Sequence, residues 1–547
     1  MSRHDGVAQR LLTDIVWERA SVRPDGPALV ELREAGGDVA LSWRELVDRA
    51  DRTASVLAGL GVRPGEAVVV QLPNSADFVT VSLALLRIGA VVCPVLPSLR
   101  ENELAHILRR SGARVLVVPE MFRNRAHARE VAAMTRGGPV AALEHLLVAR
   151  GHSPVDRLTD AERDEAHLAV HELGACVAEA GPAGEPVGPA GHSPHDVAHL
   201  LFTSGTTGEP KGVPHRMDTL NRAAELTGDR LGLTALDRVH IAAPMAHHSG
   251  FLYGMWLSML LGTVQILQPV WEAQRALRAF RDWGGTFMQG STPFLLDMVD
   301  AVDAGAEAPR SLRTFVVTGA SVPRALAARA RGSLELRVCA AWGSTETCMA
   351  TLSAPEDDPA MVAATDGRPL DGVRLRVTDD SGAVLETGRE GNLEMTGPSV
   401  FEGYLGRDDL TAEVFTGDGW YRTGDLAVLE SSGYVRITGR VKDVINRGGE
   451  KIPAGAIEQL VNAHPSVREA VIVGMPDPRL GERACLFAVL YPGEVLDLEG
   501  VRAHLDGERV TKQYWPERVE IVDALPRNPA GKVQKYVLRE RIRGRNV

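Results

Sequence analysis

The sequence predicts an α/β fold with a large N-terminal domain of helix-covered sheets plus a β-rich section, followed by a small α+β C-terminal domain. Three observations lead to this prediction. The chain has 547 residues, which is too long for one ordinary domain. Its first two hundred or so residues alternate helical periodicity with short apolar runs. After about residue 365 the pattern changes to short β-rich runs separated by turn signals.

The N-terminal part is predicted to contain parallel sheets covered by helices on both faces. Residues 42–61 have apolar side chains at helical spacing and end on a glycine, and residues 66–72 (EAVVVQL) form a short β-rich run. The pattern repeats with a helix through 82–90 and a strand at 90–96, then with a helix at 103–113 and a strand at 114–119. Apolar strands that alternate with helices are typical of such sheets.

The C-terminal part is predicted to be a separate, smaller domain. Short β-rich runs at 373–385, 391–397 and 428–440 form the β-rich section. Beyond it, loop, helix and strand patterns alternate to the end of the chain, over roughly one hundred residues, a usual domain size. We therefore predict two domains, 1–441 and 442–547, with the boundary near Arg440–Asp443.

Composition narrows the class of protein. Hydrophobic residues make up 44% and charged residues 24%, as in soluble globular proteins with ample core, and the formal net charge of -11 argues against a dedicated nucleic-acid binder. The cysteines contain no C-x-x-C pair, which predicts reduced thiols in a cytoplasmic protein without a zinc site. The charged N-terminus lacks an apolar signal core, which also favours the cytoplasm. The cysteines are Cys93, Cys176, Cys339, Cys348 and Cys485.

One uncharged run, 249–267 (SGFLYGMWLSMLLGTVQIL), is long enough to span a bilayer. It contains Gly, Ser, Tyr, Thr and Gln, lacks basic flanks and lies in the middle of the chain. We therefore predict a buried core helix over this run and no integral membrane contact.

The stretch 201-LFTSGTTGEPKGVPH-215 is rich in glycine and hydroxyl side chains around one lysine. A P-loop requires G-x-x-x-x-G-K-[ST] leading directly into a helix. Here Lys211 follows Pro210 and precedes Gly212, so that template does not fit. The composition predicts a hairpin-like loop whose backbone N–H groups and hydroxyls surround a polyphosphate, with a flexible surface turn as the alternative.

This stretch and four later segments carry a resemblance to a known family. TSGTTGEPKG resembles the phosphate loop of the adenylate-forming superfamily, which includes acyl-CoA synthetases, aryl-acid ligases and luciferases. Segments 341-AWGSTET-347, 421-YRTGDL-426, 438-TGRVKDVINRGGEKI-452 and 528-NPAGKVQK-535 follow in that family's order, so the resemblance covers essentially the whole chain. It is nearest to acyl-CoA ligases for alicyclic, aryl or medium-chain acids. The family uses ATP and Mg²⁺ to convert a carboxylic acid into an acyl-adenylate with release of pyrophosphate, and CoA is usually the second substrate.

The resemblance implies roles for particular residues. Lys532 would bridge the substrate carboxylate and the α-phosphate, Thr345 would donate to that phosphate, and Glu346 would hold Mg²⁺ through the phosphates. Asp425 would accept both ribose hydroxyls, assisted by Arg440. The full implied ATP- and AMP-binding set is Thr203, Ser204, Gly205, Thr206, Thr207, Gly208, Lys211, Gly319, Ala320, Ser321, Ala341, Trp342 (where the family more often has Tyr), Gly343, Ser344, Thr345, Asp425, Ile437, Arg440 and Lys532.

The same resemblance places the acid. His247 would lie beside the carboxylate as a catalytic residue, and His248 would begin the wall of the acyl pocket. Segment 244–255 lacks the Asp of amino-acid-activating relatives, and the small wall residues suit a bulky neutral acid, alicyclic or polycyclic, in a biosynthetic pathway. The pairs His247–His248 and His195–His199 also suggest a metal, but neither has a third ligand in the sequence. The predicted pocket is His247, His248, Phe251, Gly290, Ser291, Ala320, Gly343 and Cys348.

The family's C-terminal domain rotates between two half-reactions, so the small domain is predicted to be mobile. Lys442 would be the hinge, and the loop of Gly448, Gly449 and Lys451 would line the approach of the thiol. Ala456 stands where the family usually has Glu, so the resemblance implies the thiol half-reaction less firmly than the adenylation, while the helix that follows is still expected to form.

Two alternatives to a complete acyl-CoA ligase therefore remain open. One is an enzyme that makes only the adenylate and passes the acyl group to a phosphopantetheine carrier protein. The other is a catalytically silent nucleotide-binding regulatory protein, against which the intact set of Lys532, Glu346, Asp425 and Arg440 argues. A homodimer is possible.

Overall fold

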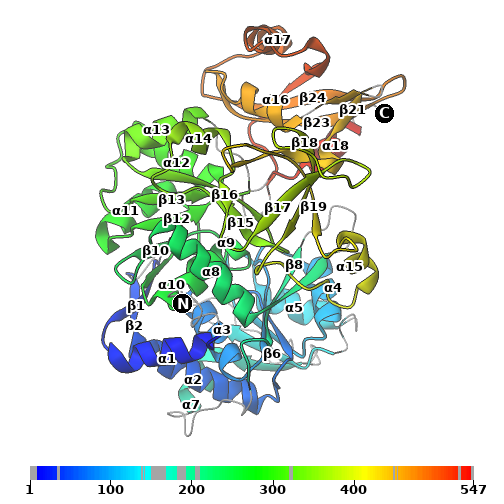
Figure 1. Cartoon of the computed structure of the whole chain (residues 1–547). Helices are drawn as coiled ribbons and strands as arrows, with labels where there is room; N and C mark the ends of the chain where they lie inside the picture. The colour runs from blue at the N-terminus through cyan, green and yellow to red at the C-terminus, as the bar shows by residue number, and fades with distance from the viewer. Residues whose placement is uncertain are drawn as a thin grey trace.

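The computed structural model describes residues 9–33, 37–136, 140, 142–149, 168–180, 192–203, 210–319, 324–447, 450–452, 454–527, 531 and 533–543. Within them, two large sheets with their helices form the bulk of the molecule, and a four-stranded and a five-stranded sheet follow along the chain. Figure 1 shows the C-terminal elements, orange to red, at one end of the larger N-terminal part. This arrangement agrees with the α/β fold expected from the sequence.

The first large sheet has seven strands, parallel except for the antiparallel pair β8–β9 at one edge. Apolar runs such as AVVV and VVCP supply its central strands, which are almost entirely buried. In order across the sheet, the strands are β7 (Ala169–Glu172), β6 (His145–Ala149), β5 (Val115–Pro119), β3 (Ala67–Val70), β4 (Val91–Pro94), β8 (Val197–Thr203) and β9 (Lys211–Arg216).

The second large sheet has nine strands, parallel in its centre and antiparallel at both edges. In order, its strands are β16 (Arg368–Pro369), β15 (Cys348–Leu352), β14 (Arg337–Ser344), β13 (Thr314–Val317), β12 (Phe287–Gly290), β10 (Arg238–Ile241), β11 (Val264–Leu267), β1 (Pro27–Glu31) and β2 (Val39–Ser42).

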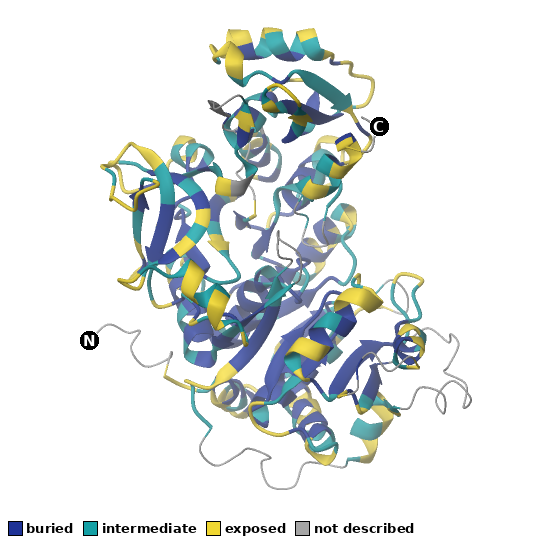
Figure 2. Ribbon diagram, turned by 90° about the vertical axis from the view of Figure 1, so that its right-hand side faces the viewer, coloured by how far each residue is buried: buried dark blue, intermediate teal, exposed yellow. Residues whose placement is uncertain are grey.

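Helices cover both large sheets, and one hydrophobic core joins residues from the two sheets with the helices between them. Figure 2 shows this buried interior in dark blue, with exposed residues on the outer helices and loops. The helices of this part are α1 (Leu12–Val22), α2 (Trp43–Gly59), α3 (Ala76–Arg87), α4 (Glu101–Ser111), α5 (His127–Thr135), α7 (Leu173–Glu179), α8 (Met217–Leu231), α9 (His248–Gly250), η1 (Phe251–Trp256), α10 (Leu257–Leu261), α11 (Ala273–Trp283), α12 (Thr292–Asp303), α13 (Arg324–Leu334), α14 (Pro359–Ala364) and α15 (Asp408–Val414).

Local sequence signals explain where some helices begin. At the start of α2, the Ser42 hydroxyl accepts from the Glu45 backbone N–H, and the Glu45 carboxylate accepts from the Ser42 backbone N–H at 2.8 Å. This capping box satisfies two N–H groups that the first helical turn leaves without partners. The predicted helix over 42–61 is thereby confirmed.

The uncharged run 249–267 is buried as expected, but only part of it is helical. A π-helical turn, η1, continues into α10, which ends at Leu261. Gly262 has a φ of +72°, a left-handed conformation that ends the helix, and Val264–Leu267 then form β11. The prediction of one helix over the whole run is therefore wrong in its last residues. Over the described residues, no helix is long and apolar enough to cross a bilayer.

The two smaller sheets follow. The antiparallel four-stranded sheet is the predicted β-rich section, and the five-stranded sheet belongs to the C-terminal part. The 3₁₀ turn η2 (Val441–Asp443) lies between them. The remaining elements are β17 (Arg374–Thr378), β18 (Glu390–Thr396), β19 (Tyr421–Leu429), β20 (Val435–Arg440), β21 (Ile445–Arg447), β22 (Glu450–Ile452), α16 (Ala454–Val461), β23 (Val467–Asp477), β24 (Gly481–Leu490), α17 (Leu498–Gly507), η3 (Lys512–Tyr514), β25 (Arg518–Ile521) and α18 (Lys535–Arg543).

Candidate active site

A cavity of about 1120 Å³ opens where the large sheets, the four-stranded sheet and the C-terminal part meet. Its wall brings together residues that lie hundreds of positions apart in the chain. This cavity is lined by most of the site residues that were proposed from the sequence and that the structure describes. They are Thr203, Lys211, His247, His248, Ser291, Gly319, Ala341, Trp342, Gly343, Ser344, Thr345, Glu346, Cys348, Asp425, Ile437 and Arg440.

Several proposed site residues lie outside the described part of the chain. They are Ser204, Gly205, Thr206, Thr207, Gly208, Ala320, Ser321, Gly448, Gly449 and Lys532. For the hinge residue Lys442 and the loop residue Lys451, the backbone is described as part of η2 and β22, respectively, while their side chains are not.

The Asp425 carboxylate is held between two donors on one wall of the cavity. Its Oδ2 accepts from the Trp342 indole N–H at 3.0 Å, and its Oδ1 is 3.0 Å from Arg440 Nε. The side chain comes from β19, and Arg440 lies opposite it on the neighbouring strand β20. Asp425 is only 4% exposed, so its orientation is fixed by these contacts before any ligand arrives.

A second wall is formed by the tight turn between β14 and β15, which carries Thr345 and Glu346. At the preceding bulge, a Cβ on Gly343 would lie 2.0 Å from the carbonyl oxygen of Cys348, so only glycine allows these strands to approach so closely. The turn is closed by the Thr347 hydroxyl, which accepts from the Ser344 N–H at 2.8 Å. The turn residues therefore have a fixed position on the wall.

Tyr404 connects the two charged residues of this wall, and the sequence did not single it out. Its hydroxyl donates to Glu346 Oε1 at 3.0 Å, and Lys211 Nζ lies 4.8 Å from its ring centre, a cation–π contact. Burial and the Glu346 charge raise the pKa of Tyr404 far above its usual value, so the phenol stays a hydrogen donor.

The hairpin predicted around TSGTTGEPKG is confirmed for the residues on both sides of the tip. Strands β8 and β9 pair antiparallel, with Thr203 opposite Lys211, and the tip between them lies outside the described residues. Both flanking residues line the cavity. The hairpin therefore brings the two residues that flank its tip to the same cavity as Glu346.

The segment around Lys532 also reaches this cavity. Arg527 and Val533 form an antiparallel bridge, and the Arg527 guanidinium donates to the Gly531 carbonyl at 2.5 Å. Gly531 has a φ of +82°, and a Cβ on it would lie 2.3 Å from Ser291 Oγ. The neighbour of Lys532 thus packs directly against the acyl-side wall of the N-terminal part.

The acyl side of the cavity differs in part from the expectation. His248, Ser291 and Cys348 line it. Phe251 is fully buried behind His248, its ring stacked on that of His199 at 4.2 Å between ring centres. Gly290, like Phe251, is not among the lining residues, since the Phe294 ring occupies the space where a Cβ would be. Phe251 and Gly290, which lie behind the wall, cannot be told from wall residues by their order in the sequence.

Two further groups at the site escaped the sequence analysis. His215 joins His248 and Cys348 as the third member of a buried group, where the sequence had shown no third potential metal ligand. Asp366 lies on the cavity wall near Asp425, and burial raises the pKa of its carboxyl to about 6. Because both residues reach the site only through tertiary packing, no local sequence pattern marks them.

The C-terminal part contributes its own contacts. Helix α16 forms with Ala456 in its first turn, and Glu458 accepts from the Ile472 N–H at 2.6 Å and from Lys535 Nζ at 2.7 Å. Asp443, in the turn η2, pairs with Arg539 at 2.6 Å. The absence of the family's Glu at position 456 therefore leaves the helix intact.

The fold and this cavity define a nucleotide-dependent acid-activating enzyme, and comparison with known proteins gives the family. Residues 16–405 match the AMP-binding enzyme family and residues 456–532 match the AMP-binding enzyme C-terminal domain. The chain belongs to this family of adenylate-forming enzymes, and it is an AMP-forming acid–thiol ligase.

Three similar proteins illustrate the relationship. A medium-chain fatty-acid–CoA ligase of Escherichia coli (strain K12) is 32% identical, over 97% of this chain and 90% of that protein. A salicylyl-CoA synthase / salicylate adenylyltransferase of a Streptomyces species is 34% identical, over 98% and 94%. The crystal structure of ATP-bound MatB from Rhodopseudomonas palustris superposes with a TM-score of 0.82 at 26% identity, over 97% of this chain and 99% of that one.

Proposed function

We propose that this enzyme activates a bulky hydrophobic carboxylic acid, alicyclic or polycyclic, aryl or medium-chain, and transfers the acyl group to CoA. The observation that carries the proposal is the meeting of two walls at one cavity. Asp425, oriented by Trp342 and Arg440, lies on one wall, while Gly531 brings the lysine-bearing loop against Ser291 on the other. A nucleotide and an acid bound there would share a single reaction space.

In the first half-reaction, a carboxylate oxygen of the acid bonds to the α-phosphorus of ATP, and the bond from that phosphorus to pyrophosphate breaks. Negative charge gathers on the α-phosphate oxygens as this happens. Lys532 would neutralise that charge and hold the carboxylate, and Thr345 would donate to the same phosphate. His247, on the cavity wall, would orient the carboxylate. The phosphate-gripping tip of the β8–β9 hairpin would retain the leaving pyrophosphate.

Glu346 is the residue that would hold Mg²⁺ here. Its carboxylate lies on the cavity wall, and one oxygen, Oε1, accepts from Tyr404. Mg²⁺ is commonly bound by one or two carboxylates together with substrate phosphates, so this donor set fits the ion. The bound ion would supply neutralising charge for the triphosphate.

A second candidate function is transfer of the acyl group to a phosphopantetheine carrier protein instead of free CoA. The observation that favours it is Ala456, at the start of α16, where the family usually has Glu. CoA and a carrier protein present the same thiol-bearing arm, so the adenylation half-reaction would be identical. The acceptor alone would differ.

Acid-dependent exchange of labelled pyrophosphate into ATP tests the adenylation step, with a panel of alicyclic, aryl and medium-chain acids. Every active acid is then incubated with ATP and CoA, with a phosphopantetheinylated carrier protein, or with neither. Formation of an acyl-CoA thioester supports the main proposal, and exclusive loading of the carrier supports the second. An absence of exchange with the entire panel would contradict both.

A further inference from the structure

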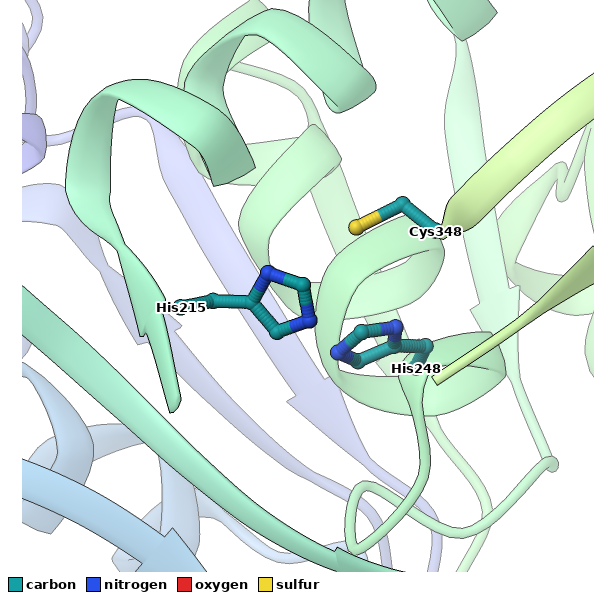
Figure 3. A group of neighbouring side chains, drawn as sticks. All are labelled: His215, His248 and Cys348. Atoms are coloured by element: carbon teal, nitrogen blue, oxygen red, sulfur yellow. The ribbon is translucent and has the colours of Figure 1, made fainter. Parts of the chain in front are cut away.

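The acyl side of the cavity ends in a group of buried side chains that includes an imidazole, and an acid made only of hydrocarbon would leave that imidazole unpaired. We call His248, Tyr253, Cys348 and Met349, which line the cavity there, the imidazole pocket. All four are buried, with exposures of 8%, 3%, 2% and 3%, respectively. Figure 3 shows the ring of His248 and the sulfur of Cys348 turned toward the ring of His215, which comes from β9.

The histidines of this group have free hydrogen-bonding capacity. Among the described residues, neither ring nitrogen of His248 has a hydrogen-bond partner, and the same holds for His215 Nδ1. The other nitrogen of His215, Nε2, lies 2.6 Å from the Thr345 carbonyl. Because a carbonyl only accepts, Nε2 carries the proton, and Nδ1 of the neutral ring is an acceptor.

Burial keeps these rings uncharged. It lowers the pKa of His215 to about 4, and it lowers the pKa of His248 far below its usual value, with further lowering by His215, His199 and His247. The same burial raises the pKa of the Cys348 thiol. An uncharged pocket has no cation to pair with a second carboxylate, so an ionised substituent would lose its water without compensation.

The spacing suits an oxygen atom. A nitrogen of His215, a nitrogen of His248 and the Cys348 sulfur lie within 4.8 Å of one another. If two of these atoms are the full 4.8 Å apart, an oxygen about 2.8 Å from both forms an angle of about 120° with them. A hydroxyl oxygen makes hydrogen bonds at such an angle. Ligand atoms around a tetrahedral zinc ion lie roughly 3.5 Å apart, and atoms within 4.8 Å of one another can include that spacing, so zinc binding is the competing interpretation of this group.

We infer that the acid activated by this enzyme carries an uncharged hydroxyl group that binds in the imidazole pocket, with His248 as the specificity-determining residue. A hydroxyl both donates and accepts, so it can donate to the unprotonated nitrogen of the neutral His248 ring or accept from its N–H. A hydrocarbon in the same place would leave the imidazole nitrogens without a partner, whereas a hydroxyl would supply one, so the site discriminates between the two acids. This inference rests on the proposed function, since it names the substrate class of the same cavity.

The test uses matched pairs of acids that share one skeleton, monocyclic aryl, bicyclic aryl or alicyclic, and differ by a single hydroxyl. Pyrophosphate exchange gives kcat/KM for each member. We expect the better hydroxylated isomer of at least one skeleton to exceed its unsubstituted partner by about tenfold or more. If acids are activated but the unsubstituted partner is equal or better on every skeleton, the inference fails while the proposed function stands. If no acid is activated, both fail.

Variants assign the effect to His248. In H248F, the kcat/KM ratio of hydroxylated to unsubstituted acid should fall toward one, and H248Q, which keeps a donor and an acceptor, should restore part of it. The control is H240Q, because His240 is equally buried but pairs with Gln268 at 2.8 Å and does not line the cavity. A ratio unchanged in H248F overturns the inference, and so does an equal drop in H240Q.

A zinc-binding assay tests whether the group of His215, His248 and Cys348 is a metal site. Wild-type protein is incubated with zinc alone, dialysed and assayed for bound metal, beside C348A. We expect no zinc that depends on Cys348. One zinc per chain, lost in C348A, would show that the group is a metal site and would overturn the inference.

Discussion

Trp342 donates its indole N–H to Asp425 Oδ2 at 3.0 Å, while Arg440 occupies the other oxygen of the same carboxylate. An indole can therefore orient the carboxylate as well as offer a flat surface to an adenine. W342F keeps an aromatic ring on the wall, although a smaller one, and removes the donor. We expect KM for ATP to rise by about two- to tenfold, the usual value of one hydrogen bond, with little change in thermal stability.

The companion variant D425N separates orientation from charge. It should raise KM for ATP more than W342F does, because an amide offers one acceptor oxygen where the carboxylate offers two for the ribose hydroxyls. Pyrophosphate exchange at varied ATP concentration measures both variants. An unchanged KM in D425N would remove Asp425 from the nucleotide site, and an effect of W342F larger than that of D425N would assign the indole a role beyond orientation.

Asp366 makes stability depend on pH. Burial raises the pKa of its carboxyl to about 6, a backbone N–H of Ile437 at 2.8 Å opposes this, and the Asp425 charge adds to it. The usual value in an unfolded chain is about 3.9. The folded state thus holds the proton more tightly, and the stabilisation present below pH 4 is lost as pH rises through about 6, by up to about 3 kcal/mol.

D366N removes this titration and keeps an acceptor for the Ile437 N–H. The variant should be more stable than the wild type at pH 7.5, by a larger margin than at pH 5, in thermal unfolding of the two proteins side by side. Equal margins at both pH values would mean that the carboxyl does not titrate in this window. D379N serves as a control, because Asp379 is a half-buried loop residue whose pKa is lowered by the Ser381 hydroxyl.

The sequence was sufficient for those parts of the site that short motifs encode. The turn carrying Thr345 and Glu346, the strand residue Asp425 and the β8–β9 hairpin lie on one cavity because each motif has a local backbone requirement, such as the glycine at position 343. The helix of 42–61 likewise follows from its own capping residues. Local chemistry determines these elements.

Contacts between distant segments could not be predicted in this way. Tyr404 reaches Glu346 across 58 positions, and His215 reaches the Thr345 carbonyl across 130. Such pairs depend on how the sheets pack, and periodicity within a segment carries no information about its partner. The same limit explains why Phe251 was expected on the cavity wall, although its ring lies behind that wall against His199.

Arg468 connects the C-terminal part to α12. Its guanidinium lies 3.0 Å from Asp297 and 3.5 Å from Asp300, so it stabilises the orientation in which Gly531 packs against Ser291. Partly exposed ion pairs contribute up to about 1 kcal/mol, or roughly fivefold in population. R468A should therefore lower the rate of adenylation by a few-fold and leave the rate of thioester formation from supplied acyl-adenylate equal or higher.

The control for R468A is R502A, since Arg502 pairs with Glu499 within α17 and has no ion pair with the N-terminal part among the described residues. Stopped-flow measurement of pyrophosphate release and of thioester formation gives the two rates separately. Parallel losses in both half-reactions would show that Arg468 maintains the fold of the domain and does not favour one orientation.

Lys532 is predicted to act in adenylation alone. Its two neighbours in the chain, Gly531 and Val533, line the cavity, and Gly531 packs on Ser291. Loss of a charge that stabilises the transition state typically costs about 10²- to 10³-fold. K532A should therefore lose pyrophosphate exchange by that factor and still convert supplied acyl-adenylate to thioester at a rate near that of the wild type. The control is K535A, because Lys535 lines the same cavity but is paired with Glu458 at 2.7 Å. If K535A lost exchange as severely as K532A, the effect would come from disruption of the loop, and the charge of Lys532 would not be the cause.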